Sequence, residues 1–277
     1  MGNRFNYSQD GSLNKTNSNP IQGDKPTKNI ILTIVAALAV NFSALAANIG
    51  VDTISSYGGT WSNGSDPASS PFSNWDLWTT GTGASAFAGH YIGAPAAGMA
   101  NIGNSFVLYG NGATDTYANA QRTFDGGPLT AGQSFKISLA TAWRAGSKGI
   151  DLFDSSWNSL FNFNVTADKH FAGGSELLNG ATPWGYGANS LWNITATQVN
   201  STQLQVSIDR GSDTYTSGLI TGSLNAFKLY AGDLQGSQGE RNLYANNLEI
   251  IPEPSSSLLM GLGLAGLAVL RRTRKNA

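Results

Sequence analysis

The side chains that most often do chemistry in proteins are few in this sequence and far apart. The two histidines, His90 and His170, are 80 positions apart, and the chain contains no cysteine. Glycoside hydrolysis on a β-sandwich needs paired acids, such as a Glu-x-Asp-x-Glu run, and no such run occurs. Neither an HExxH pair nor a Gly-x-Ser-x-Gly elbow is present. The sequence therefore predicts a protein that is not an enzyme, with a secreted carbohydrate-active enzyme as the alternative.

Aromatic residues are the stronger candidates for a functional role, because an exposed indole face can stack on the apolar face of a sugar ring. Four aromatic residues in turn-like, Gly- and Ser-rich segments are the candidate carbohydrate-binding residues: Trp61, Trp157, Trp184 and Tyr186. Packing against the body is the alternative for each tryptophan. Trp143 and Trp192 occupy strand-like positions, so we expect both in the core.

Metal binding is a weaker hypothesis. Asp151 and Asp154 fall at the ends of expected loops, where carboxylate and carbonyl oxygens can converge on calcium. No EF-hand spacing supports such a site, and solvated turn aspartates are the simpler explanation. We therefore expect no cofactor, with calcium as the one alternative.

Charge and composition narrow the class of protein. Only 12% of the residues are charged, and half of the 16 basic residues lie in the two terminal segments. Residues 47–251 contain 8 Lys and Arg against 14 Asp and Glu, a net charge of −6. Because nucleic-acid binding needs a basic face, we expect no nucleic-acid partner. Low charge, many glycines and no cysteine are typical of a β-rich exported protein that depends on its core for stability.

The N-terminal segment, residues 1–46, has the features of an extended leader and signal peptide. An apolar run over residues 30–40 follows Lys25 and Lys28, and Ala44 and Ala46 supply small residues at the −3 and −1 positions. This pattern predicts a signal-peptide helix with cleavage after Ala46. An uncleaved anchor is the alternative, but the run is shorter than the ~20 residues that a membrane span prefers.

The C-terminal segment, residues 252–277, combines three features in a fixed order. Pro252, Glu253 and Pro254 come first, followed by the segment of residues 255–270, which is apolar from Leu258 to Leu270. A basic cluster follows: Arg271, Arg272, Arg274 and Lys275. A helix of residues 255–270 reaches roughly 24 Å, close to the ~30 Å hydrocarbon core. The basic cluster favours cytoplasmic headgroups, which predicts a transmembrane helix with the body on the opposite side of the membrane.

These features together resemble the PEP-CTERM sorting signal of Gram-negative, biofilm-forming bacteria. The resemblance covers the last 26 residues. It implies that an exosortase, a membrane-embedded cysteine transpeptidase or protease, recognises Pro252, Glu253 and Pro254 after transient anchoring in the inner membrane. It further implies release to the cell surface, the outer membrane or the extracellular matrix. An ordinary tail anchor is the alternative.

Short alternating strands dominate the body, residues 47–251. Phe135, Ile137 and Leu139 alternate with Lys136 and Ser138, a period of two that indicates a strand with one face on the core. Further candidate strands cover residues 106–109, 120–124, 150–153, 160–165, 191–199, 203–209, 215–220, 224–230 and 242–250. Turn signals separate them, which predicts an all-β, antiparallel jelly-roll β-sandwich.

Two segments of the body have distinct patterns. Residues 149–165 predict a hairpin with Trp157 at its tip, and this pattern resembles concanavalin A-like and laminin G-like folds. Residues 51–104 predict an edge strand and long loops packed on the sandwich. We therefore expect an exported, non-catalytic surface or exopolysaccharide-matrix protein whose body binds carbohydrate or associates with itself. A structural adhesin without a small ligand is a further alternative.

Overall fold

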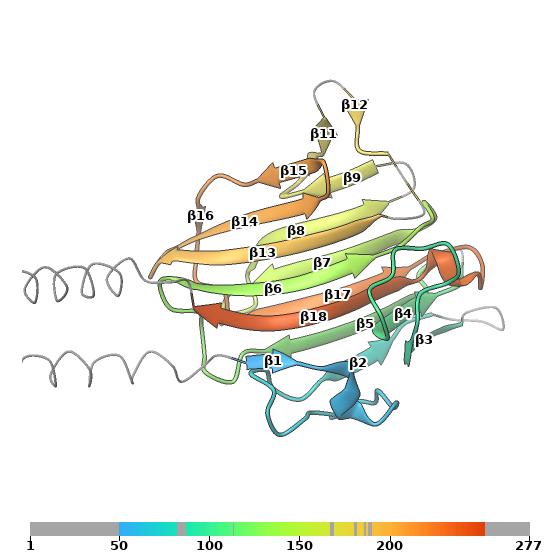
Figure 1. Cartoon of the computed structure of the whole chain (residues 1–277), viewed down its shortest axis with the longest axis horizontal. Coiled ribbons are helices and arrows are strands. Elements are labelled where there is room, and N and C mark those ends of the chain that lie inside the picture. The colour runs from blue at the N-terminus through green and yellow to red at the C-terminus, as the bar shows by residue number, and fades with distance from the viewer. Residues whose placement is uncertain are drawn as a thin grey trace, which may run out of the picture. The chain divides into compact units, whose positions relative to one another are not determined.

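The computed structural model describes residues 50–81, 87–112, 114–166, 169–179, 182–185, 187 and 190–252. They form two stacked antiparallel sheets (Figure 1), which confirms the predicted jelly-roll β-sandwich. Within these ranges no helix is long and apolar enough to cross a membrane. The predicted signal-peptide helix and C-terminal membrane helix lie outside the described residues.

The larger sheet, here called sheet I, has nine strands among the described residues. Its main path in spatial order is β15 (Asp213–Thr216), β14 (Gln203–Arg210), β13 (Leu191–Asn200), β6 (Gln133–Ala140), β18 (Leu243–Pro252), β4 (Ser105–Gly110) and β3 (Ala88–Gly93). Two short strands complete it: β1 (Gly50–Asp52) pairs with β18, and β16 (Ile220–Thr221) pairs with β14.

The second sheet, sheet II, packs behind sheet I in Figure 1. Its order is β10 (Ser175–Glu176), β9 (Lys169–Ala172), β8 (Ser159–Thr166), β7 (Ser147–Phe153), β17 (Ala226–Gly232), β5 (Tyr117–Thr123) and β2 (Asp76–Thr79). The smaller elements are the β11 (Leu178–Asn179) and β12 (Thr182–Pro183) hairpin and the 3-10 helices η1 (Ile54–Tyr57) and η2 (Gly239–Arg241).

The core lies between the sheets and follows the predicted alternation. Phe135 of β6 stacks on Phe227 of β17 with ring centroids 4.9 Å apart, so aromatic packing joins the two sheets directly. Each expected strand has a counterpart, except that residues 215–220 form two short strands instead of one. Ser217 interrupts them because its hydroxyl, not a backbone carbonyl, accepts the N–H of Val206 at 2.9 Å.

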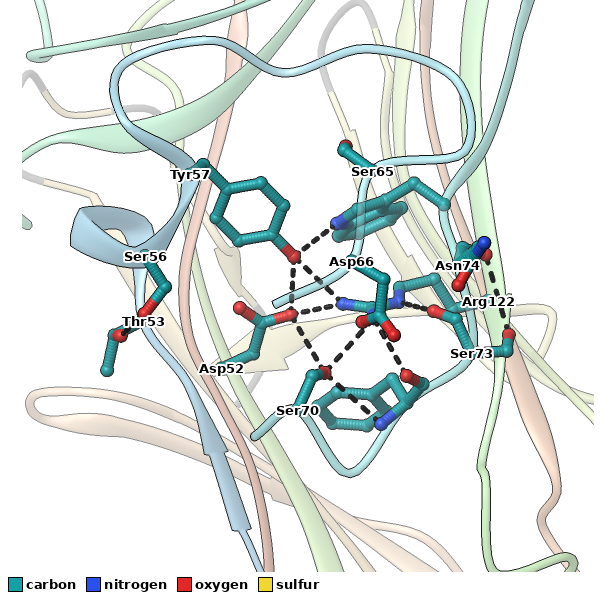
Figure 2. Close-up of polar contacts among 12 residues, drawn as sticks. Asp52, Thr53, Ser56, Tyr57, Ser65, Asp66, Ser70, Ser73, Asn74 and Arg122 are labelled. Atoms are coloured by element: carbon teal, nitrogen blue, oxygen red, sulfur yellow. Dashed lines mark hydrogen bonds and ion pairs between the residues drawn. The ribbon is translucent and has the colours of Figure 1, made fainter. Parts of the chain in front are cut away.

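The segment before β2 is held to the sandwich by one buried side chain, Arg122 of β5. Figure 2 shows its guanidinium between the carboxylates of Asp52 and Asp66, and both ion pairs are formed. Arg122 also donates to the carbonyl oxygen of Phe72 at 2.8 Å and to that of Ser73. Because Asp52 and Arg122 have no exposed side-chain area, the pair is shielded from water and from salt screening.

A tyrosine extends this buried network, here called the Arg122 clamp. The Tyr57 hydroxyl donates to Asp52 Oδ2 at 2.7 Å and accepts from Trp75 Nε1 at 2.9 Å and Arg122 at 3.0 Å. Burial raises the pKa of the Tyr57 hydroxyl well above its usual range, so it stays a neutral donor. The clamp thereby fixes β1, η1 and the following loop to sheet II.

Candidate functional site

A groove of ≈ 380 Å³ lies on the outer face of sheet I, which points away from sheet II. It is here called the outer groove, and four strands line it: Val51 from β1; Lys136, Ile137 and Ser138 from β6; Asn193, Ile194 and Thr195 from β13; Asn247 and Glu249 from β18. Successive side chains of a strand point to opposite faces of the sheet. The polar residues that alternate with the buried core residues therefore line the outer groove.

Strand register brings these polar side chains together. Lys136 of β6 lies opposite Thr195 on one side and Glu249 on the other. Two residues further along β6, on the same face, Ser138 lies opposite Asn193. Residues up to 113 positions apart in the sequence therefore share one surface through the pairing of β13, β6 and β18.

An irregularity in β18 shapes the floor of the outer groove. The register of β18 on β6 shifts between Asn246 and Glu249, and Asn247 adopts a left-handed φ of 55°. Asparagine tolerates this region better than most residues, and a bulge re-aims the side chain that it carries. Asn247 Nδ2 accordingly donates to Ser138 Oγ at 3.1 Å, and Ser138 Oγ donates to Asn193 Oδ1 at 2.8 Å.

The connection between β3 and β4 packs on the same face of sheet I. Met99 and Ile102 cover Tyr244 of β18 and Ala140 of β6, which forms a small second core outside the sandwich. Asn246 ties the connection down, since its Nδ2 donates to the carbonyl oxygens of Ile102 at 2.7 Å and Asn104 at 2.9 Å. The outer groove therefore lies beside a fixed segment.

The chemistry of the outer groove is polar and nearly neutral. Lys136 Nζ is 3.8 Å from Glu249 Oε1, and these side chains are 39% and 30% exposed, so both remain accessible to a ligand. Amide and hydroxyl groups supply the remaining polar lining. Glu249 carries the one carboxylate among the lining residues, whereas glycoside hydrolysis uses two. This set suits hydrogen bonding to a polyhydroxylated ligand.

Two of the predicted carbohydrate-binding residues are buried instead of exposed. Trp61 is 5% exposed and stacks edge-on against Trp75 at 5.0 Å, because its loop folds back over the sandwich. Trp184 is 2% exposed, and the guanidinium of Arg210 covers its ring at 5.0 Å. The expectation that these two indoles present a free face is wrong. Tyr186 lies outside the described residues.

Trp157 occupies the tip of the β7–β8 hairpin, as predicted, and is 42% exposed. Of the two tryptophans expected in the core, one is buried and one is exposed. Trp192 is fully buried, whereas Trp143 is 44% exposed, which corrects its assignment to the core. Trp143 follows the end of β6, and its carbonyl oxygen accepts from the buried Lys148 at 2.6 Å, so its side chain points outward.

The carboxylates of the two calcium candidates, Asp151 and Asp154, are bound by donor groups of the protein itself. Asp151 accepts from Asn162 Nδ2 at 2.6 Å and pairs with Lys228 at 2.9 Å. Asp154 accepts from the backbone N–H groups of Ser156 and Asn158 within its own turn. The part of the chain that the structure describes contains no cluster of three or more metal-ligating side chains.

The two histidines are held neutral and lie apart from the outer groove. Burial lowers the pKa of His170 to about 4, with a further contribution from the charge of Arg210. Burial also lowers the pKa of His90, which contacts the carbonyl oxygen of Asn119 at 2.8 Å. His170 is fully buried in the sandwich, and His90 is half-buried.

The fold defines an antiparallel β-sandwich protein, and its C-terminal segment matches a family model. Residues 251–275 match the PEP-CTERM protein-sorting motif. The chain thus carries a sorting signal for exosortase-dependent export and membrane-associated sorting in bacteria. The motif begins inside β18, at the last two residues of that strand. Glu253, Pro254 and the basic cluster lie outside the described residues, as do Ala44 and Ala46.

Solved structures are similar to the body only distantly. A sialidase shares 12% identity at a TM-score of 0.42, and the match covers 65% of this chain and 17% of that one. The receptor-binding domain of botulinum neurotoxin C/D mosaic serotype shares 11% at 0.38, over 70% and 46%. Galectin-Ib of Xenopus laevis shares 15% at 0.24, over 45% and 90%. No curated protein sequence matches the chain. This chain spans less than half of the first two structures, and similarity at this level carries no functional argument.

Proposed function

We propose that this chain is an exported, non-catalytic protein of the bacterial cell surface or exopolysaccharide matrix, and that its body binds polysaccharide in the outer groove. The observation that carries the first half is the PEP-CTERM motif at residues 251–275. It overlaps the last two residues of β18, a strand of the sandwich, so the sorted cargo is this β-sandwich body.

The composition of the outer groove supports the second half. Sugar hydroxyls are at once donors and acceptors, and the lining offers both kinds of partner through Asn193, Asn247 and Thr195. The ion pair of Lys136 and Glu249 adds charge-assisted donors and acceptors at the edge. A single carboxylate beside a lysine favours binding over hydrolysis.

Mass spectrometry of mature protein from the cell surface tests the sorting proposal. We expect peptides that end within the Pro252–Pro254 region and an N-terminus at Ala47. Recovery of an intact tail through Ala277 in surface material would contradict processing by an exosortase.

A glycan array and a polysaccharide pull-down on residues 47–251 test the binding proposal. We expect retention on at least one polysaccharide, with the host's own exopolysaccharide included. A body that is retained on none of them, while circular dichroism shows it folded, would count against polysaccharide binding and favour a structural adhesin.

A further inference from the structure

The body of the protein begins and ends at one end of the sandwich. Gly50 lies opposite Ile250, and Pro252 lies opposite Gln133 at the start of β6. We call this the exit end. Strand register assigns five connecting segments to it: residues 66–72, 124–132, 154–158, 198–203 and 217–225.

The sorting motif leaves the exit end on a very short tether. Five residues, from Glu253 to Ser257, separate Pro252 from Leu258, where the apolar run begins. Six peptide steps reach at most about 20 Å even when fully extended. While the apolar run is in the bilayer, the exit end must therefore lie within about 20 Å of the membrane surface.

The surface chemistry of the exit end differs from that of the opposite end. Its five segments contain no Lys or Arg, whereas surface cations gather at the opposite end: Arg144, Lys169, Arg210 and Arg241. Apolar side chains are exposed at both ends, and those at the opposite end include Phe87 at 63% and Trp143 at 44%. At the exit end, Trp157 at 42%, Val199 at 46% and Leu219 at 55% stand in segments without Lys or Arg.

Trp157 is the aromatic member of these three, and its backbone is strained. Its φ is 61°, a left-handed conformation in which glycine or asparagine is the usual choice for a turn. The turn holds it firmly, since Asp154 accepts two backbone N–H groups and the indole packs on Phe153 at 5.2 Å. Tryptophan at such a site needs a reason other than turn formation, and indoles favour the membrane interface.

We propose that the exit end docks on the lipid surface in the membrane-anchored intermediate, with Trp157 as its interfacial anchor. This inference rests on the proposed sorting route. The occupant is the surface of a zwitterionic bilayer, because the exit end lacks cations for anionic headgroups. One indole and two aliphatic side chains bind lipid weakly, so the contact depends on the tether and ends when the sorting motif is cut.

Single-cysteine labelling tests the docking directly, because the chain contains no cysteine of its own. Leu219→Cys, which is 55% exposed at the exit end and keeps Trp157 in place, and the control Trp143→Cys, which is 44% exposed at the opposite end, receive the same environment-sensitive fluorophore. The full chain is produced in a host without an exosortase and reconstituted in phosphatidylcholine vesicles. We expect a blue-shifted emission at position 219, quenched by brominated lipid and unchanged by salt, and an aqueous emission at position 143.

A spacer variant tests the role of the tether. Twenty Gly and Ser residues inserted between Pro254 and Ser255 extend the reach by roughly 25 Å on average, so the emission at position 219 should approach that at position 143. Aqueous emission at position 219 in vesicle-bound chain, or a blue shift that survives the spacer, would overturn the docking and leave sorting intact. A chain that does not float with the vesicles would contradict the membrane intermediate itself and the docking with it.

Discussion

Gly50 lies directly opposite Ile250 in neighbouring antiparallel strands. The first described strand of the body therefore pairs with the strand that runs into the sorting motif. Since β18 also pairs with β6 and β4, it is an interior strand of sheet I. Sheet I is completed only when the chain through Pro252 has joined it.

The interior position of β18 predicts where the chain can be cut. A stop after Pro252 should leave the melting temperature of the mature body unchanged, because no strand pairing is lost. A stop after Asn247 removes the buried Leu248 and Ile250 and all pairing with β1, and should prevent stable folding. Thermal unfolding followed by circular dichroism measures both; equal melting temperatures would show that the end of β18 contributes nothing.

The Arg122 clamp predicts a large loss of stability when its cation is removed. Arg122→Leu leaves the carboxylate of Asp52 buried without its countercharge, which should lower the free energy of unfolding by about 3–5 kcal/mol. Urea titration measures this change. Lys136→Leu is the control, because that exposed pair at 3.8 Å should contribute only about 0–1 kcal/mol. Similar losses in the two variants would show that burial of the Arg122 pair is unimportant.

His170 predicts a defined pH dependence of stability. Its pKa is about 4 in the fold, against about 6.5 in an unfolded chain. Between these values the unfolded chain binds a proton that the folded chain does not, so stability falls as the pH drops from about 6.5 to 4. His170→Phe should remove roughly 3 kcal/mol of this dependence. Urea titrations at pH 4.5 and 7 give the free energy of unfolding at each pH. The same change between the two pH values in the variant and in the parent would rule out this role.

The outer groove predicts a set of binding variants that leave the fold intact. Asn193→Ala removes an accessible amide of the lining, and the loss of one hydrogen bond should weaken polysaccharide binding roughly 3- to 10-fold. Ser207→Ala, on the same outer face of neighbouring β14 but outside the outer groove, is the matched control and should bind as the parent does. Retention of each variant on the polysaccharide is the measurement. Equal weakening by both would place the binding site elsewhere.

The sequence was informative about the strands because alternation is local. The spacing of two residues predicted that three side chains of β6 are buried, and the structure confirms this for Phe135, Ile137 and Leu139. The exposure of the tryptophans could not be predicted in the same way from neighbouring residues. Trp61 stands in a Ser- and Gly-rich segment that looks exposed, yet its environment is set by Trp75 and by His90 of a distant strand.

The outer groove was hidden for a related reason. Lys136 and Ser138 were recognisable as outward-facing residues, but nothing near them in the chain says that Glu249 and Asn193 lie beside them. The sequence did not indicate the β18 bulge at Asn247, since two adjacent asparagines are not a pattern specific to a bulge. The nearest available hint was the cluster of polar residues at alternating strand positions.

The sequence alone determined the C-terminal sorting signal, the all-β class and most strand positions, because each depends on the order and spacing of neighbouring residues. The tertiary structure decided which strands are adjacent, and with that the outer groove, the Arg122 clamp and the position of Gly50 and Pro252 at one end of the sandwich. These features join residues far apart in the chain through sheet register, and pairing between distant strands is a property of the whole fold that no local pattern encodes.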